Sequence, residues 1–348
     1  MNTINYNLQN MTFKNTFIKL SAMGALALTI QACSRPSAPG IYKDDQIQSG
    51  VRKTLHSLQD ELLSALKTDD RHAQELLMSQ EFIDDVRMRV KVCSEATIRM
   101  KKADYSLFRE YYIVRDTVGD TTTIKDRTSG INNYDLKVPT LAREMYVAQF
   151  IAKKSPLTWM ITATYHKLDY GWKIDDMEIT PYSENHRTAP EQIAFAQKML
   201  DKKYYLDANN AMVGAMNDLY PSNRWMYEKH DDISKMADLT RAEISANLPL
   251  PITVKQLPSE PLIWRITIQY DKEGTFPNIN YVSKTNLLDT TALKKENAEF
   301  GKIIGEVFEG VDKDKKYIFY TIYNKQLSGP NKGKVDIRDH FDIRQTLQ

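Results

Sequence analysis

The chain lacks the features that mark several large protein classes. It has only two cysteines in 348 residues, its paired lysines are scattered, and it carries no long basic run. Binding to nucleic acid needs a clustered positive field, so this class is set aside. Charged residues make up 26% and hydrophobic residues 42% of the chain, which is the composition of an ordinary soluble globular protein.

Motifs for catalysis and metal binding are also missing. None of the six histidines has the helical spacing of a metal site, and no GxSxG, SxxK or glycine-rich phosphate loop occurs. Asp312 to Lys315 resembles the start of a calcium loop, but the glycine and glutamate of an EF-hand do not follow at the required positions. The sequence therefore predicts no metal, no cofactor and no catalytic residue.

Acidic residues are absent from the N-terminal region. The first acid is Asp44, whereas Lys14 and Lys19 precede an apolar run from Leu20 to Ile30. Eleven residues rise about 16 Å as a helix, which is too short for a hydrocarbon core of roughly 30 Å. A basic start followed by a short apolar run predicts an export signal over residues 1–32 rather than a membrane span.

The end of this segment, Ile30-Gln31-Ala32-Cys33, resembles the lipobox of bacterial lipoprotein precursors. The resemblance implies cleavage before Cys33, a diacylglycerol on its thiol and an acyl chain such as palmitate on the new amine. Two or more acyl chains give lasting membrane attachment without a transmembrane helix. Ser34 follows the cysteine where an Asp would favour the inner membrane, so the resemblance implies the outer membrane of a two-membrane bacterium.

The residues that follow have two consequences for the mature chain. Residues 33–45 are rich in Ser, Pro and Gly and predict a tether. Once Cys33 is lipidated only Cys93 remains, so the body must be stable without an internal disulfide. The alternation in RVKVCSEATI around Cys93 predicts a strand and a buried, inert thiol.

Hydrophobic periodicity predicts helices first and strands after them. One apolar stripe runs along residues 46–67, and Asp69 and Asp70 can cap a second helix. Strands are expected from Val86 onward, with a polar, turn-rich interval at residues 118–136. The clearest strands are 144–152 and 157–166, and Gly171 turns the second of these into a partner strand over residues 172–179.

Helices followed by an antiparallel meander that closes with Tyr170-Gly171-Trp172-Lys173-Ile174 resemble the nuclear transport factor two-like, cystatin-like cone superfamily over residues 46–183. The resemblance implies a curved sheet that wraps a long helix and forms a pocket. The superfamily has no universal catalytic set, so no residue roles carry over. The residues proposed to line this pocket are Tyr111, Tyr112, Trp159, Tyr165 and Tyr170, and packing in the core or at the sheet rim is the alternative.

The rest of the chain is expected to hold a helical connector and a second, smaller α+β unit. Residues 184–247 predict one helix hairpin, and residues 248–348 predict strands around a helix that is capped by Asp289 or Thr290 and ends at Gly310. The predicted fold class is α+β, with segments 1–32, 33–45, 46–183, 184–247 and 248–348.

Three functions remain open at this point. The favoured one is a membrane-anchored envelope lipoprotein that binds a small apolar ligand or another envelope protein without catalysis. The second is an envelope enzyme with acid–base groups in the cone-like pocket, and the third is a structural accessory subunit. If the chain is an enzyme, we expect convergent titratable groups with shifted pKa values. If it is a binding module, we expect an apolar pocket, and if it is an accessory subunit, we expect an exposed apolar patch.

Overall fold

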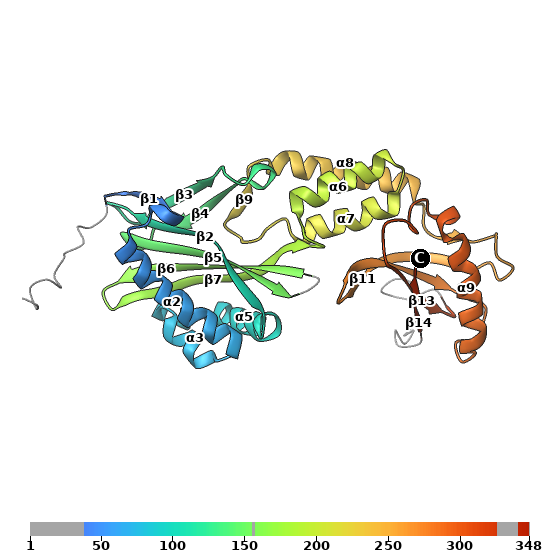
Figure 1. Cartoon of the computed structure of the whole chain (residues 1–348), viewed down its shortest axis with the longest axis horizontal. Helices are drawn as coiled ribbons and strands as arrows, with labels where there is room; N and C mark the ends of the chain where they lie inside the picture. Colours follow the sequence, from blue (N-terminus) through green and yellow to red (C-terminus); the bar gives the residue numbers. More distant parts are fainter. Residues whose placement is uncertain (1–37, 155–156, 326–339, 348) are drawn as a thin grey trace, which may run out of the picture. The chain divides into compact units, whose positions relative to one another are not determined.

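The computed structural model describes residues 38–154, 157–325 and 340–347 (Figure 1). Helices and strands mix along the chain, so the predicted α+β class is confirmed. The described strands form three sheets. Cys33 and the expected export signal lie outside the described residues.

The first sheet has six strands in the order β1-β2-β5-β6-β7-β8, and every neighbouring pair is antiparallel. Its strands are β1 (Gly40–Lys43), β2 (Asp104–Val114), β5 (Glu144–Lys154), β6 (Leu157–Leu168), β7 (Gly171–Glu184) and β8 (Arg187–Thr188). The β6–β7 hairpin confirms the predicted turn, since Gly171 has a φ of +109° that a residue with a side chain rarely adopts.

Strand β1 corrects the expected extent of the tether. Gly40 to Lys43 pair in antiparallel register with Tyr111 to Val114, and a 3-10 turn, η1 (Asp44–Gln46), follows. Residues 40–45 therefore belong to the folded body. Their composition is typical of a linker, but the backbone hydrogen bonds to β2 hold residues 40–43 in the sheet.

Helices cover one face of the first sheet. They are α2 (Ser49–Thr68), α3 (Arg71–Leu77), α4 (Gln80–Asp84), α5 (Val86–Glu95) and the short η2 (Ala96–Met100). The apolar stripe predicted for α2 is confirmed, because Leu55, Leu62 and Leu66 are fully buried in one cluster with Ile161 and Tyr165 of β6.

The strands predicted from Val86 to Met100 are wrong, because this segment is helical. Apolar and basic residues alternate in it, but Val92, Cys93 and Ala96 are buried at helical spacing. The carboxylate of Asp85 caps α5 by accepting from the backbone N–H of Met88 at 3.0 Å. Cys93 is buried, as predicted, although on a helix, and burial raises the pKa of its thiol.

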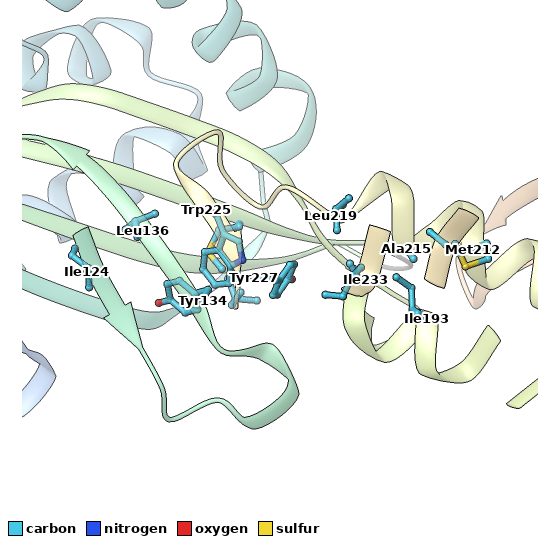
Figure 2. Packing of buried hydrophobic residues seen from close by; sticks show 14 of the residues in the cluster. Ile124, Tyr134, Leu136, Ile193, Met212, Ala215, Leu219, Trp225, Tyr227 and Ile233 are labelled. Carbon is cyan, nitrogen blue, oxygen red and sulfur yellow. The ribbon is translucent and has the colours of Figure 1, made fainter. Parts of the chain in front are cut away.

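A second sheet and three helices form one buried hydrophobic cluster with Tyr111, Val147 and Met160, on the face of the first sheet away from α2. The strands are β3 (Thr121–Asp126), β4 (Tyr134–Pro139) and β9 (Trp225–Tyr227), and the helices are α6 (Ala189–Asp201), α7 (Tyr205–Asn217) and α8 (His230–Asn247). Figure 2 shows the buried side chains of this cluster, in which the rings of Tyr134 and Trp225 stack with centroids 3.5 Å apart. Because both faces of β6 are covered, every residue from Trp159 to His166 is buried, including those that alternation assigned to the more polar face.

Two predictions for this region need correction. The interval 118–136, which was expected to consist of turns, contains β3 and the start of β4. In β3 the buried residues Thr122, Ile124 and Asp126 alternate with exposed ones, and threonine is a residue that favours strands. The expected single helix hairpin is α6–α7, to which α8 adds a third helix after β9.

The third sheet has the order β10-β11-β12-β13-β14. Its elements are β10 (Ile252–Thr253), β11 (Leu262–Asp271), β12 (Gly274–Val282), α9 (Thr290–Val307), β13 (Tyr317–Tyr323) and β14 (Phe341–Thr346). Helix α9 connects β12 to the parallel strand β13, and the carboxylate of Asp289 caps it through the N–H of Ala292 at 2.9 Å. The predicted helix and its cap are confirmed, whereas the strand expected at residues 248–257 is reduced to Ile252 and Thr253.

Candidate functional site

A cavity of about 230 Å³ lies between α5, the strands β6 and β7, and the loop that leads into β9. Its apolar walls are Met88, Val92, Trp159, Met177, Ile179 and Pro181. Its polar lining includes Lys91, Glu95, Arg99, Glu178 and Asn223. Ligand sites for drug-sized molecules measure about 300–1,000 Å³, so this cavity limits an occupant to a smaller molecule.

Trp159 forms the aromatic wall of this cavity. Its side chain is almost fully buried, and the guanidinium of Arg99 lies over its ring, 4.1 Å from the centroid. The pairing of β6 with β7 shifts register between Thr158 and Trp159, which is a β-bulge. Bulges re-aim side chains and occur often beside functional sites.

The two cations at the cavity come from the helical side. Lys91 on α5 is exposed, and Arg99 on η2 donates to the carboxylate of Glu95 one turn earlier. Arg99 is therefore held between a carboxylate and an aromatic face, with more than a third of its side chain exposed to solvent. Lys91 and Arg99 together with the single acid Glu95 give this side of the rim a net positive charge.

Glu178 fixes the loop on the other side of the cavity. This buried carboxylate accepts from the hydroxyl of Ser222, from the backbone N–H of Asn223 at 3.0 Å and from the amide side chain of Asn223. Burial raises the pKa of Glu178, while the bonds from Ser222 and Asn223 oppose that rise. Its hydrogen bonds are used to hold the loop, so Glu178 acts here as a positioning residue.

The structure does not gather the five aromatic residues that were proposed as pocket residues. Among them, Trp159 lines the cavity, whereas Tyr165 is fully buried beside Tyr146. Tyr112 donates to Glu144 at 2.6 Å, and Tyr170 is 58% exposed at the β6–β7 turn.

Tyr111 lies on the opposite face of the sheet. Its hydroxyl donates to Asp126 at 2.9 Å and lies 2.8 Å from the hydroxyl of Tyr134. Lys43 pairs with the same carboxylate at 2.7 Å, and the pKa of Asp126 is lowered below its usual range, since these bonds outweigh desolvation. Tyr111 therefore belongs to a polar network inside the core.

Sequence reasoning missed Lys91, Glu95, Arg99 and Glu178. The signal for the first three was present once the segment is treated as a helix, because residues 88, 92, 95 and 99 are spaced by three or four and residue 91 is four before residue 95. Nothing in the sequence links Glu178 to Ser222 and Asn223, because that contact joins segments 44 residues apart.

A second buried polar cluster ties α2 to the sheet. The carboxylate of Glu110, with no exposed side-chain area, accepts from Arg52 at 2.6 Å, from Tyr146 at 2.5 Å and lies 2.9 Å from a ring nitrogen of His56. Gln59 also donates to Glu110 and to the hydroxyl of Tyr146. This cluster uses its hydrogen-bonding groups on one another, which is the arrangement of a structural network.

The residues that the structure describes contain no group of three or more His, Cys, Asp or Glu placed to hold a metal ion. None of the helices in those residues is both long and apolar enough to cross a membrane.

Comparison of the chain with models of protein families, with curated proteins and with solved structures gives no match in any of the three.

Proposed function

We propose that this chain is a lipid-anchored protein of the bacterial cell envelope whose body binds a small molecule in the cavity at Trp159. The anchor is Cys33, on the outer membrane more readily than on the inner one because Ser34 follows it. The cavity at Trp159 supports a binding role, since half of its lining residues are apolar and the one buried carboxylate among them, Glu178, is held by its own loop.

The lining indicates the class of ligand. Met177, Ile179 and the ring of Trp159 favour an apolar body, and Lys91 and Arg99 favour an anionic end. A short-chain carboxylate has both features. The single observation that carries this proposal is the position of the Arg99 guanidinium over the Trp159 ring at the edge of an apolar cavity.

Octanoate is a suitable probe, and octan-1-ol is the matched neutral compound. We expect octanoate to bind the wild-type chain at least tenfold more tightly than octan-1-ol by isothermal titration calorimetry, because a charge-assisted hydrogen bond contributes about 1.5–3 kcal/mol. Arg99→Gln is expected to remove this preference and to leave the affinity for octan-1-ol nearly unchanged.

Arg115→Gln is the control, because Arg115 pairs with Asp120 at 3.4 Å and does not line the cavity. Equal affinity for the acid and the alcohol in the wild-type chain would contradict the anionic-ligand assignment. A loss of octanoate binding in Arg115→Gln as large as in Arg99→Gln would exclude the cavity as the site.

A further inference from the structure

The outer face of α5 and η2 combines exposed apolar side chains with a concentration of positive charge. Val86, Val90 and Ile98 are 57%, 54% and 62% exposed. Residues 86–102 contain six basic residues, Arg87, Arg89, Lys91, Arg99, Lys101 and Lys102, and one acid, Glu95. Single exposed apolar residues are ordinary, but three within 13 positions of so basic a segment form a patch that needs an explanation.

Helix geometry places four of these residues on one surface of α5. Val86 and Val90 are one turn apart, and Arg87 and Lys91 form the adjacent row one turn apart, so the two rows run side by side along α5. Val92, which lies on the side of the helix away from Val90, is buried in the core.

One acid, Glu95, continues the row of Arg87 and Lys91, and the acids around this face pair with the basic residues beside them. Glu75 pairs with Arg89 at 3.6 Å, Asp69 with Lys101 at 3.5 Å, and Glu95 with Arg99. Asp84 and Asp85 precede the helix, and Asp85 is used as its cap. Arg87 and Lys102 are exposed and available to an external anion, and so is Lys91, which also lies at the rim of the cavity.

We propose that the face formed by Val86, Arg87, Val90, Lys91, Ile98 and Lys102 docks on the surface of a bilayer that contains anionic phospholipid. Lipid headgroups satisfy both parts of the face, because they attract the cations while the boundary with the acyl chains accepts the valines and the isoleucine. The proposal does not depend on the lipid anchor, but agrees with it. Six residues separate Cys33 from Gly40, so the two Cα atoms can be at most about 25 Å apart, which would keep the body close to the membrane that holds Cys33.

Co-sedimentation with vesicles tests this face. The full-length chain with Cys33→Ala, which cannot carry the thioether lipid, is mixed with vesicles of phosphatidylcholine alone or with 30% phosphatidylglycerol. Each basic residue near an anionic surface contributes about fivefold in affinity, so Arg87→Ser with Lys91→Ser is expected to weaken binding to the anionic vesicles by roughly 25-fold.

Two further variants make the test specific. Lys294→Ser with Lys295→Ser removes the same charge from exposed positions on α9 and is expected to change affinity less than twofold. Val86→Ser with Val90→Ser keeps every charge and is expected to weaken binding at least fivefold, because the apolar contact with the bilayer is lost.

Three results would overturn the proposal. Equal binding to the two kinds of vesicle would exclude recognition of anionic lipid, and an equal loss in the α9 variant would reduce the effect to net charge. Capture of the chain by poly-glutamate, without binding to anionic vesicles, would assign the face to an acidic protein partner instead. Circular dichroism of each variant checks that the fold is retained.

Discussion

Replacement of Glu110 by alanine is expected to lower the free energy of unfolding by about 3 kcal/mol. Glu110 is the acceptor on which Arg52 of α2 and Tyr146 of β5 converge, and its side chain is fully buried. Removing one partner of a buried ionic cluster costs about 3–5 kcal/mol, because the other groups remain without compensation. The lower end applies here, since about a third of the Arg52 side chain is in contact with solvent.

Urea denaturation at pH 7 measures this loss, with Glu144→Ala as the control. Glu144 also accepts from a tyrosine, Tyr112, and pairs with Lys167, but 28% of its side chain is exposed. The control is expected to cost about 1 kcal/mol or less. Glu110→Gln keeps one acceptor oxygen and is expected to fall between the two. A cost below 1 kcal/mol for Glu110→Ala would mean that the cluster does not hold α2 against the sheet.

Replacement of Asp218 by asparagine is expected to stabilise the chain by about 3 kcal/mol more at pH 8 than at pH 5. Asp218 ends α7, is completely buried, and neither carboxyl oxygen has a hydrogen-bond partner within the described residues. Burial, with a smaller contribution from Glu184, raises the pKa of Asp218 to about 8. A carboxylate at a helix C-terminus is also opposed by the helix dipole.

The sign of the pH dependence follows from proton binding. Between the ordinary pKa near 4 in the unfolded chain and about 8 in the folded chain, the folded state binds the extra proton. Stability from this group is therefore complete at low pH and is lost as the pH rises toward 8. Asparagine is neutral throughout and removes this loss.

Thermal unfolding of the wild-type chain and of Asp218→Asn between pH 5 and pH 8 measures the effect. Asp238→Asn is the control, because Asp238 is an exposed residue of α8 that pairs with Arg241 at 2.8 Å. The difference between Asp218→Asn and wild type should grow with pH, and that of the control should stay near zero. A difference that is constant across this pH range would show that Asp218 is ionised in the folded chain.

The fold was predictable from the sequence where the hydrophobic pattern, turn or cap of an element lies within that element itself. The stripe of α2, the β6–β7 hairpin with Gly171 and the capped helix α9 each carry their own local signal. The segment 86–100 was misassigned because alternation of apolar and basic residues fits a strand as well as a helix that exposes Val86 and Val90. Val86 and Val90, which fit the pattern of a strand, are the exposed valines of the face that we propose to dock on a membrane.

The candidate site was less accessible to prediction than the fold. Of its walls, Trp159 was singled out from the aromatic composition of the strands, but Arg99 and Glu178 depend on contacts between distant segments. Tyr111 and Tyr165 illustrate the opposite error. A sheet that is covered on both faces buries aromatic residues on each side, so richness in tyrosine does not by itself form a pocket.

Native mass spectrometry of the full-length chain, extracted gently from membranes of its own host, tests the central claim most directly. We expect a species with the mass of residues 33–348 plus a diacylglycerol and an acyl chain, and no such species from Cys33→Ala. Additional mass that is retained by the wild-type chain and lost in Arg99→Gln would identify the cavity ligand. A soluble, lipid-free species cut at another position would contradict the anchor at Cys33 and the envelope function built on it.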